Sequence, residues 1–198
     1  PIKSSAASDV YKRQLISLSD HSEIRLKGFI DRVDEVLDAI RIIDYKTGHK
    51  DFDYAELLYG KNLQMLLYLF AIERAKGHHA AAGKTPAGVL YVPGRVDVER
   101  VEPGQTDETL TKQRQKNLVR QGLLLRDEQV LQAMEPGDTP VYLPYQNKKG
   151  ELTGSLATRE QFRLLEDFVS GSLRELTQKL FSGTVSPNPI CLLYTSPS

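Results

Sequence analysis

The stretch IRLKGFIDRVDEVLDAIRIIDYKTG, residues 24–48, decides the fold of this chain. Apolar, often β-branched residues alternate with polar ones over residues 24–36 and again over residues 40–46. Such alternation is typical of β-strands with one buried face. A short turn at residues 37–39 separates the two runs, so the pattern predicts a β-hairpin.

This hairpin would bring two carboxylates together. Side chains alternate along a strand, so Asp44 and Lys46 share one face. If the turn centres on residues 37 and 38, Asp31 lies opposite Asp44, with Cβ atoms ~5 Å apart. Two carboxylates this close repel each other unless a cation lies between them. Oxygen ligands suit Mg²⁺, which can activate water, and Lys46 can stabilise charge on a phosphodiester.

The alternative is an ordinary surface hairpin, in which Asp44 forms an ion pair with Lys46 or Arg41. The tripeptide Asp-Tyr-Lys by itself favours that interpretation. The combination with Asp31 upstream and Gln64 downstream is more specific, and it favours phosphodiester hydrolysis.

The rest of the chain predicts a mixed α/β domain. Residues 53–76 fit one long helix with Asp53 as N-cap, Glu56 completing an approximate capping box and Gly77 as the stop. Gln64 and Tyr68 lie four residues apart and share a face of this helix. That face could turn toward the hairpin, although the spacing alone favours a core Tyr68 and a polar edge at Gln64. Further expected elements are a strand over 88–92, helices over 106–121, 126–134 and 158–181, and a ribbon over 141–154.

The composition is that of one globular domain, with 198 residues, 40% hydrophobic and 26% charged. Since the net charge is zero, the basic footprint of many DNA-binding domains is missing. DNA binding would have to come from a local groove or from other parts of the protein. No apolar run is long enough to span a membrane, and a cytoplasmic location is expected.

Both ends of the chain resemble a sequencing adapter. Residues 9–14 (DVYKRQ) can be encoded as GAT GTG TAT AAG AGA CAG, and residues 191–196 (CLLYTS) as TGT CTC TTA TAC ACA TCT. These two DNA words are reverse complements over nearly their whole length. We therefore expect residues 1–14 and 191–198 to be adapter-derived and residues 15–190 to be a nuclease-domain fragment. Native tails are the alternative.

Three motifs carry a family resemblance: residues 28–34 (GFIDRVD), 44–48 (DYKTG) and 64–68 (QMLLY). They resemble the RecB-type branch of the PD-(D/E)XK nucleases, with Ile30 in place of the namesake proline. Four further runs are similar to the AddB family, found in bacterial AddAB helicase–nucleases: residues 55–60 (AELLYG), 86–91 (PAGVLY), 121–125 (QGLLL) and 182–185 (SGTV).

The resemblance implies a PD-(D/E)XK restriction-endonuclease-like core, a mixed central sheet flanked by helices and here truncated at both ends. It implies Asp31 and Asp44 as ligands of Mg²⁺ (or Mn²⁺), Lys46 as the catalytic lysine, and Gln64 and Tyr68 as a supporting motif. It further implies exonuclease action on a DNA strand, double-strand-break repair by recombination and an AddA partner.

The same resemblance implies a 4Fe–4S cluster in the full-length family, whose cysteines lie outside this chain. Two other interpretations remain open. One is a non-catalytic DNA-binding or scaffold module, and the other is a RecB-like nuclease of a CRISPR or phage system.

Overall fold

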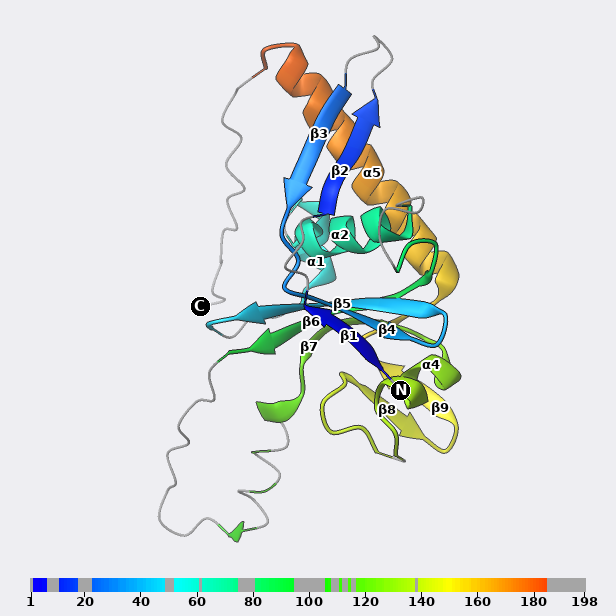
Figure 1. The fold of residues 1–198 in the computed structure, drawn as a ribbon. Helices are drawn as coiled ribbons and strands as arrows, with labels where there is room; N and C mark the ends of the chain where they lie inside the picture. The colour runs from blue at the N-terminus through cyan, green and yellow to red at the C-terminus, as the bar shows by residue number, and fades with distance from the viewer. Residues whose placement is uncertain are drawn as a thin grey trace, which may run out of the picture.

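The chain forms a mixed β-sheet with helices on both faces (Figure 1). The computed structural model describes residues 2–6, 11–17, 23–48, 52–60, 62–74, 81–94, 106, 107, 111, 114, 117–137 and 139–184. The strands are β1 (Lys3–Ala6), β2 (Tyr11–Ser17), β3 (Glu23–Gly28), β4 (Arg32–Val36), β5 (Ala39–Lys46), β6 (Thr85–Pro93), β7 (Gln121–Leu125), β8 (Tyr145–Lys148), β9 (Glu151–Gly154) and β10 (Leu156–Ala157). The helices are α1 (Tyr54–Leu58), α2 (Leu63–Glu73), α4 (Glu128–Met134) and α5 (Arg159–Phe181).

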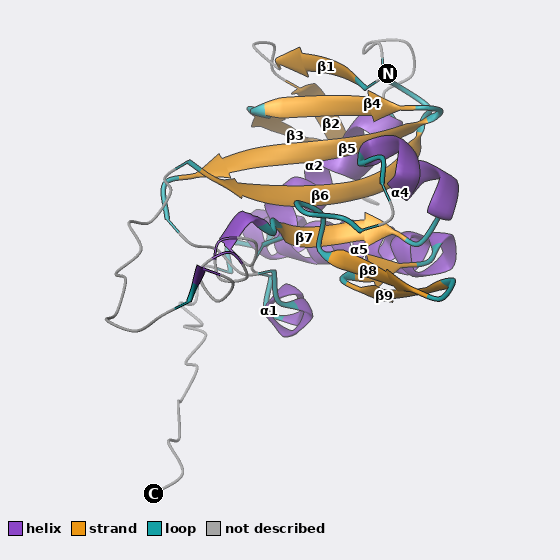
Figure 2. Ribbon diagram, turned by 90° about the horizontal axis from the view of Figure 1, so that it is seen from below, coloured by secondary structure: helices purple, strands orange, loops and turns teal. Residues whose placement is uncertain are grey.

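The central sheet has the strand order β1-β4-β5-β6-β7-β10. The pairs β5–β6 and β7–β10 are parallel and the others are antiparallel. Helices α2 and α5 lie over one face, and α4 with the β8–β9 ribbon lies over the other, as Figures 1 and 2 both show. The predicted α/β class with a mixed sheet is therefore confirmed.

The predicted hairpin is present as β4 and β5, and its register is the expected one. Arg32 lies opposite Ile43 and Val36 lies opposite Ala39. The turn consists of Leu37 and Asp38, and Leu37 adopts a left-handed conformation with φ 55°. Both faces of β5 are buried from Ala39 to Ile43, which anchors the hairpin in the middle of the sheet.

One continuous strand over residues 24–36 was expected, and this expectation is wrong. The chain leaves strand conformation between Gly28 and Arg32, so β3 pairs with β2 in a separate ribbon while β4 joins the central sheet. Gly28 packs against the ring of Tyr68, so closely that an added Cβ would lie 2.0 Å from the Tyr68 hydroxyl. The break leaves Asp31 immediately before β4.

The single helix expected over residues 53–76 is also wrong, because the structure has two helices there. Asp53 caps α1 as predicted, since its carboxylate accepts a hydrogen bond from Ala55 N at 2.8 Å. The chain then turns through Gly60 (φ 76°) and Asn62 (φ 59°), conformations that a continuing helix does not contain. Helix α2 ends at Glu73, and the predicted stop at Gly77 lies outside the described residues.

The second half of the chain follows the predicted order of elements, except that the central sheet gains two further strands. The expected strand over 88–92 is β6, the helix over 126–134 is α4, and the ribbon over 141–154 is β8–β9. Within the expected helix over 106–121, the described residues 107, 111, 114, 117 and 118 are helical, seven residues lie outside the described part of the chain, and Gln121 instead begins β7. The helix over 158–181 is confirmed as α5, with a capping box between Thr158 and Gln161. Strands β7 and β10 were not predicted.

Parts of the segment expected to be adapter-derived form strands. β1 pairs with the outer edge of β4, and β2 forms the ribbon with β3. An edge strand can accept many short sequences because it pairs mainly through its backbone. The adapter origin of residues 1–14 and 191–198 stays a prediction.

Candidate functional site

The candidate site lies where β4 begins and β5 ends. The register of the hairpin, extended by one residue beyond the pair of Arg32 and Ile43, places Asp31 opposite Asp44. The carboxylate of Asp31 accepts a hydrogen bond from the backbone N–H of Tyr45 at 2.9 Å. This contact ties Asp31 to the end of β5 although Asp31 stands outside the strand.

Asp44 has a carboxylate oxygen that is buried and accepts no hydrogen bond. This atom, Oδ2, forms an ion pair with the Lys46 ammonium. The angles between the two groups are not those of a hydrogen bond. The Asp44 side chain is 19% exposed and that of Lys46 is 35% exposed, so both face a partly covered edge. A buried carboxylate oxygen requires a cation, and in this structure the Lys46 ammonium is that cation.

The two residues predicted on the helix contact each other, and one of them contacts the end of β3. Gln64 donates a hydrogen bond from Nε2 to the Tyr68 hydroxyl at 2.9 Å. Tyr68 in turn lies against Gly28, three residues before Asp31. Helix α2 packs on β5 and β6, and Tyr68 packs against the core at the start of the segment that leads to Asp31. Tyr68 is partly buried and Gln64 is exposed.

Tyr91 of β6 is a neighbour of the site that the sequence pattern did not predict. Tyr91 lies beside Asp44 in the parallel β5–β6 register, and Lys46 Nζ lies 5.9 Å from the centre of its ring. Burial raises the pKa of the Tyr91 hydroxyl to about 12, and the negative charges of Asp44 and Glu56 act in the same direction. Tyr91 therefore keeps its proton at neutral pH beside two carboxylates. In the sequence, the run of residues 86–91 carries a family similarity but no signal of a role for Tyr91.

The donor set fits a hard divalent cation. Two aspartate side chains at one edge supply oxygen, the ligand that Mg²⁺ prefers, and Asp44 Oδ2 is buried with the Lys46 ammonium as its partner. Among the described residues no group of three or more histidine, cysteine, aspartate or glutamate side chains could hold a metal ion. Mg²⁺ keeps several waters and binds substrate phosphate, so two protein carboxylates are compatible with such a site.

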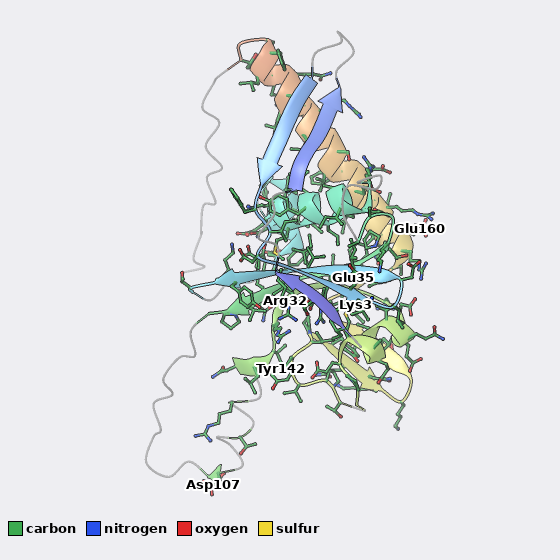
Figure 3. All side chains as sticks on the ribbon, viewed as in Figure 1. Lys3, Arg32, Glu35, Asp107, Tyr142 and Glu160 are labelled. Carbon is green, nitrogen blue, oxygen red and sulfur yellow. The ribbon has the colours of Figure 1, made fainter. Side chains whose placement is uncertain are left out.

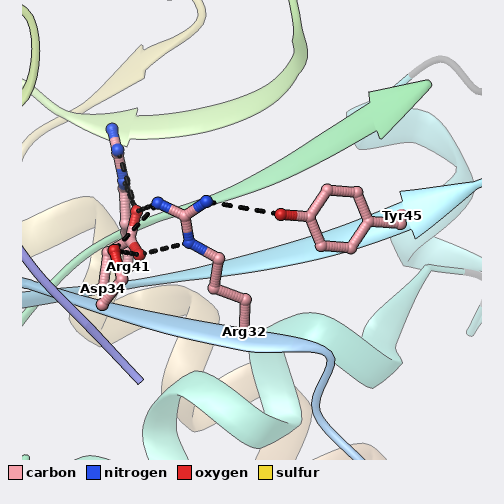
Figure 4. Close-up of polar contacts among 5 residues, drawn as sticks. Arg32, Asp34, Arg41 and Tyr45 are labelled. Carbon is pink, nitrogen blue, oxygen red and sulfur yellow. Dashed lines mark hydrogen bonds and ion pairs between the residues drawn. The ribbon is translucent and has the colours of Figure 1, made fainter. Parts of the chain in front are cut away.

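A second ion network occupies the opposite face of the same hairpin (Figure 4). Asp34 is fully buried and accepts hydrogen bonds from Arg41 Nη2 at 2.9 Å and from Arg32 Nε at 2.6 Å. Burial works to raise the pKa of Asp34, but the hydrogen bonds from Arg32 and Ser4 and the charge of Arg41 outweigh it and lower this pKa. Of the two ion pairs in the alternative interpretation, Asp44–Lys46 is present, and Asp44–Arg41 is excluded because Arg41 binds Asp34 on the other side of the sheet.

No described helix combines the length and the apolar character needed to cross a membrane.

Comparison with known proteins places these observations in a family. Residues 4–192 match the family model described as the PD-(D/E)XK nuclease superfamily. The chain is 37% identical over 186 residues to the B subunit of the ATP-dependent helicase/deoxyribonuclease of Clostridium novyi, an alignment that covers 88% of this chain and 16% of that protein. The corresponding proteins from Acetivibrio thermocellus and Listeria monocytogenes are 34% and 35% identical, over 90% and 92% of this chain and 16% and 17% of theirs.

The chain thus spans about one sixth of the length of the curated relatives that it matches.

Proposed function

Because this chain belongs to the PD-(D/E)XK nuclease superfamily, we propose that it is the nuclease part of a helicase–nuclease and hydrolyses DNA phosphodiester bonds with a divalent metal ion. The observation that carries the proposal is the paired position of Asp31 and Asp44, with Lys46 beside them. The relatives are named as B subunits of a helicase/deoxyribonuclease, which supports the DNA substrate and the helicase context.

In this proposal each residue has a separate task. Asp31 and Asp44 would hold Mg²⁺, with Mn²⁺ as a substitute. The bound ion supplies Lewis acidity and a lowered pKa of a coordinated water. Lys46, which pairs with Asp44 in this structure, would stabilise negative charge on the phosphate with its ammonium group. Gln64 and Tyr68, which share a face of α2 and a hydrogen bond, would orient the DNA strand.

The proposal extends to the assembly and its setting. We propose that the whole protein acts with an AddA-type partner, as an exonuclease in repair of double-strand breaks, in the cytoplasm. The relatives are named as one subunit of a larger enzyme, which supports a partner. The 4Fe–4S cluster of the family does not fit the residues of this chain, because four thiolates are required and the sequence contains one cysteine.

The test is cleavage of an end-labelled single-stranded oligonucleotide by the chain, with and without Mg²⁺. We expect cleavage only with the metal, and we expect Asp44→Asn to abolish it while the circular dichroism spectrum stays unchanged. Asp167→Asn is the matched control, because Asp167 is an exposed aspartate on α5. Cleavage that continues in Asp44→Asn at the parent rate would refute the assignment of this site.

A further inference from the structure

Arginine and tyrosine side chains gather on the sheet face opposite Asp44. Arg32 and Arg41 share this face of the hairpin with Tyr45, because they alternate with Asp31, Asp44 and Lys46. Arg120 immediately precedes β7, beside the end of β6 that pairs with Tyr45. In Figure 3 Arg32 and Tyr142 both lie on the side of the sheet that carries the β8–β9 ribbon. We call this group the arginine–tyrosine surface: Arg32, Arg41, Tyr45, Arg120 and Tyr142.

The three arginines of the surface exceed in number the two carboxylates beside them, those of Asp34 and Glu135. Asp34 accepts hydrogen bonds from both Arg32 and Arg41, so its two oxygens are in use. Arg41 is 3% exposed, and its Nη1 is buried without a hydrogen-bond partner. A guanidinium stays charged when buried, so Arg41 adds positive potential from below the surface. Burial lowers the pKa of Arg41, and the charges of Arg120 and Arg32 lower it further, whereas Asp34 opposes them.

The exposed part of this surface combines guanidinium groups with aromatic rings. Tyr142 is 44% exposed, and the Arg120 guanidinium lies 5.3 Å from the centre of its ring. Tyr45 is 47% exposed and accepts a hydrogen bond from Arg32 Nη1 at 3.3 Å (Figure 4). Each ring therefore lies beside a cation and presents area to solvent. This pairing of cations and exposed rings is the composition of single-strand-binding platforms, where bases stack and phosphates meet arginines.

The segment that carries Tyr142 is held firmly in place. The carboxylate of Glu135, at the end of α4, accepts hydrogen bonds from the backbone N–H groups of Val141, Tyr142 and Leu143 at 2.8 to 3.2 Å. The backbone N–H of Arg120 also donates to the Tyr142 carbonyl at 2.8 Å. A backbone held in this way loses little freedom when a base stacks on the Tyr142 ring, which favours binding. In these hydrogen bonds both oxygens of the Glu135 carboxylate accept from backbone N–H groups, so this carboxylate is held by the segment that it orders.

From these contacts we propose that the arginine–tyrosine surface binds a single DNA strand, with Arg32 and Arg120 contacting phosphates and Tyr45 and Tyr142 stacking on bases. The surface adjoins the catalytic edge, because Arg32 follows Asp31 and Tyr45 stands between Asp44 and Lys46. One strand could therefore pass around this edge of the sheet from one face to the other. The inference rests on the proposed function for its substrate, and it adds a binding surface that the cleavage chemistry does not require.

The test is the affinity of the chain for a fluorescein-labelled oligothymidylate, measured by fluorescence anisotropy in EDTA over a range of NaCl concentrations. Tyr142→Ala should weaken binding about fivefold or more, the effect of losing one stacked base. Arg120→Gln should also weaken binding and should reduce the slope of log K against log salt by about 0.7, the value for one lost phosphate contact on a single strand. Thermal unfolding of each variant at the parent midpoint shows that the fold is intact.

Exposed residues on α5 provide the matched controls. Phe181→Ala removes a ring that is 53% exposed, and Arg174→Gln removes an exposed guanidinium. Both control variants should bind as the parent does. Tyr142→Ala and Arg120→Gln that bind like these controls, with the parent salt slope, would overturn the inference.

The two proposals fail in different ways. If the parent cuts DNA with Mg²⁺ while Tyr142→Ala and Arg120→Gln bind like the controls, the proposed function stands and the surface is refuted. If the parent binds the oligonucleotide with the expected losses in both variants but cuts no DNA, the surface stands and the nuclease assignment is refuted.

Discussion

At the scale of single residues, Asp44 and Lys46 are paired in a way that suits a metal site. Lys46 neutralises the charge of Asp44, yet Asp44 Oδ2 accepts no hydrogen bond. A divalent ion bound to Asp44 could replace the lysine as the cation that balances this carboxylate. With such an ion present, the Lys46 ammonium would be available to a phosphate and Asp44 would keep a cationic partner.

Replacing Lys46 separates binding from catalysis. We expect Lys46→Met to lower the cleavage rate about a hundredfold or more, as when one stabilising donor is removed from an active site. Metal affinity should not fall, because the competing ammonium is gone. Single-turnover cleavage and a metal titration on the same preparation check both statements. A variant that cuts at the parent rate would exclude a role for Lys46.

The sequence was sufficient for some of these residues and not for others. Asp31 and Asp44 could be paired because a two-residue turn fixes the register of an antiparallel hairpin. Tyr91 lies on a parallel neighbour of β5, and a sequence does not reveal the register between strands that a long connection joins. The same hairpin register also pairs Asp34 with Arg41, so the sequence already contains the signal for the buried ion network.

At the scale of secondary structure, two interruptions shape the site. The chain breaks between β3 and β4 at Gly28, and the helix breaks between α1 and α2 at Gly60 and Asn62. Alternation and helical periodicity both continue across these breaks, so the sequence pattern predicted one strand and one helix. The physical cause of the first break is tertiary, since Tyr68 of α2 occupies the space above Gly28. Contacts of this kind override local propensity.

Gly28→Ala tests the close packing at the strand break. The new Cβ would lie 2.0 Å from the Tyr68 hydroxyl, so the ring must move, and we expect a loss of about 1–3 kcal/mol in the free energy of unfolding. Urea unfolding measures the loss. In a Tyr68→Ala background the same substitution should cost much less. Gly171→Ala is the control, because no atom lies within 4 Å of its added Cβ, and it should not destabilise the chain.

The ion network of β4 and β5 makes a second prediction about stability. Asp34→Leu leaves the buried Arg41 charge without its carboxylate, and we expect a loss of about 3–5 kcal/mol. The double variant Asp34→Leu/Arg41→Met should recover most of this loss, because it removes both charges together. Urea unfolding checks both values. An equal loss in the single and double variants would contradict the idea of an uncompensated charge.

The pH dependence of the same network has a definite sign. Since the folded pKa of Asp34 lies below its ordinary 3.8, the carboxylate stabilises the fold above that value. The contribution is lost as the pH falls through the lowered folded pKa. The difference in free energy of unfolding between the parent and Asp34→Leu/Arg41→Met should therefore be constant above about pH 5. Below that pH the parent should lose stability relative to the double variant.

At the scale of the whole molecule, charge is local rather than global. The net charge of the chain is zero, which predicted the absence of a broad basic footprint. The structure instead gathers Arg32, Arg41 and Arg120 on one face of the sheet and two aspartates on the other. The mixed α/β class and the order of most elements followed from the sequence. The sequence did not predict that the arginines and the two aspartates lie on opposite faces of the sheet. That arrangement depends on the register of β4 and β5 together with the position of β7.

The central claim is that Asp31 and Asp44 hold one divalent ion together. The most direct measurement is a titration of the chain with Mn²⁺, in which electron paramagnetic resonance reports the free ion. We predict that the parent binds Mn²⁺, that Asp31→Asn and Asp44→Asn each weaken binding at least about tenfold, and that Asp167→Asn does not. If Asp31→Asn and Asp44→Asn bind Mn²⁺ as tightly as the parent, the two aspartates do not form the metal site and the account is wrong.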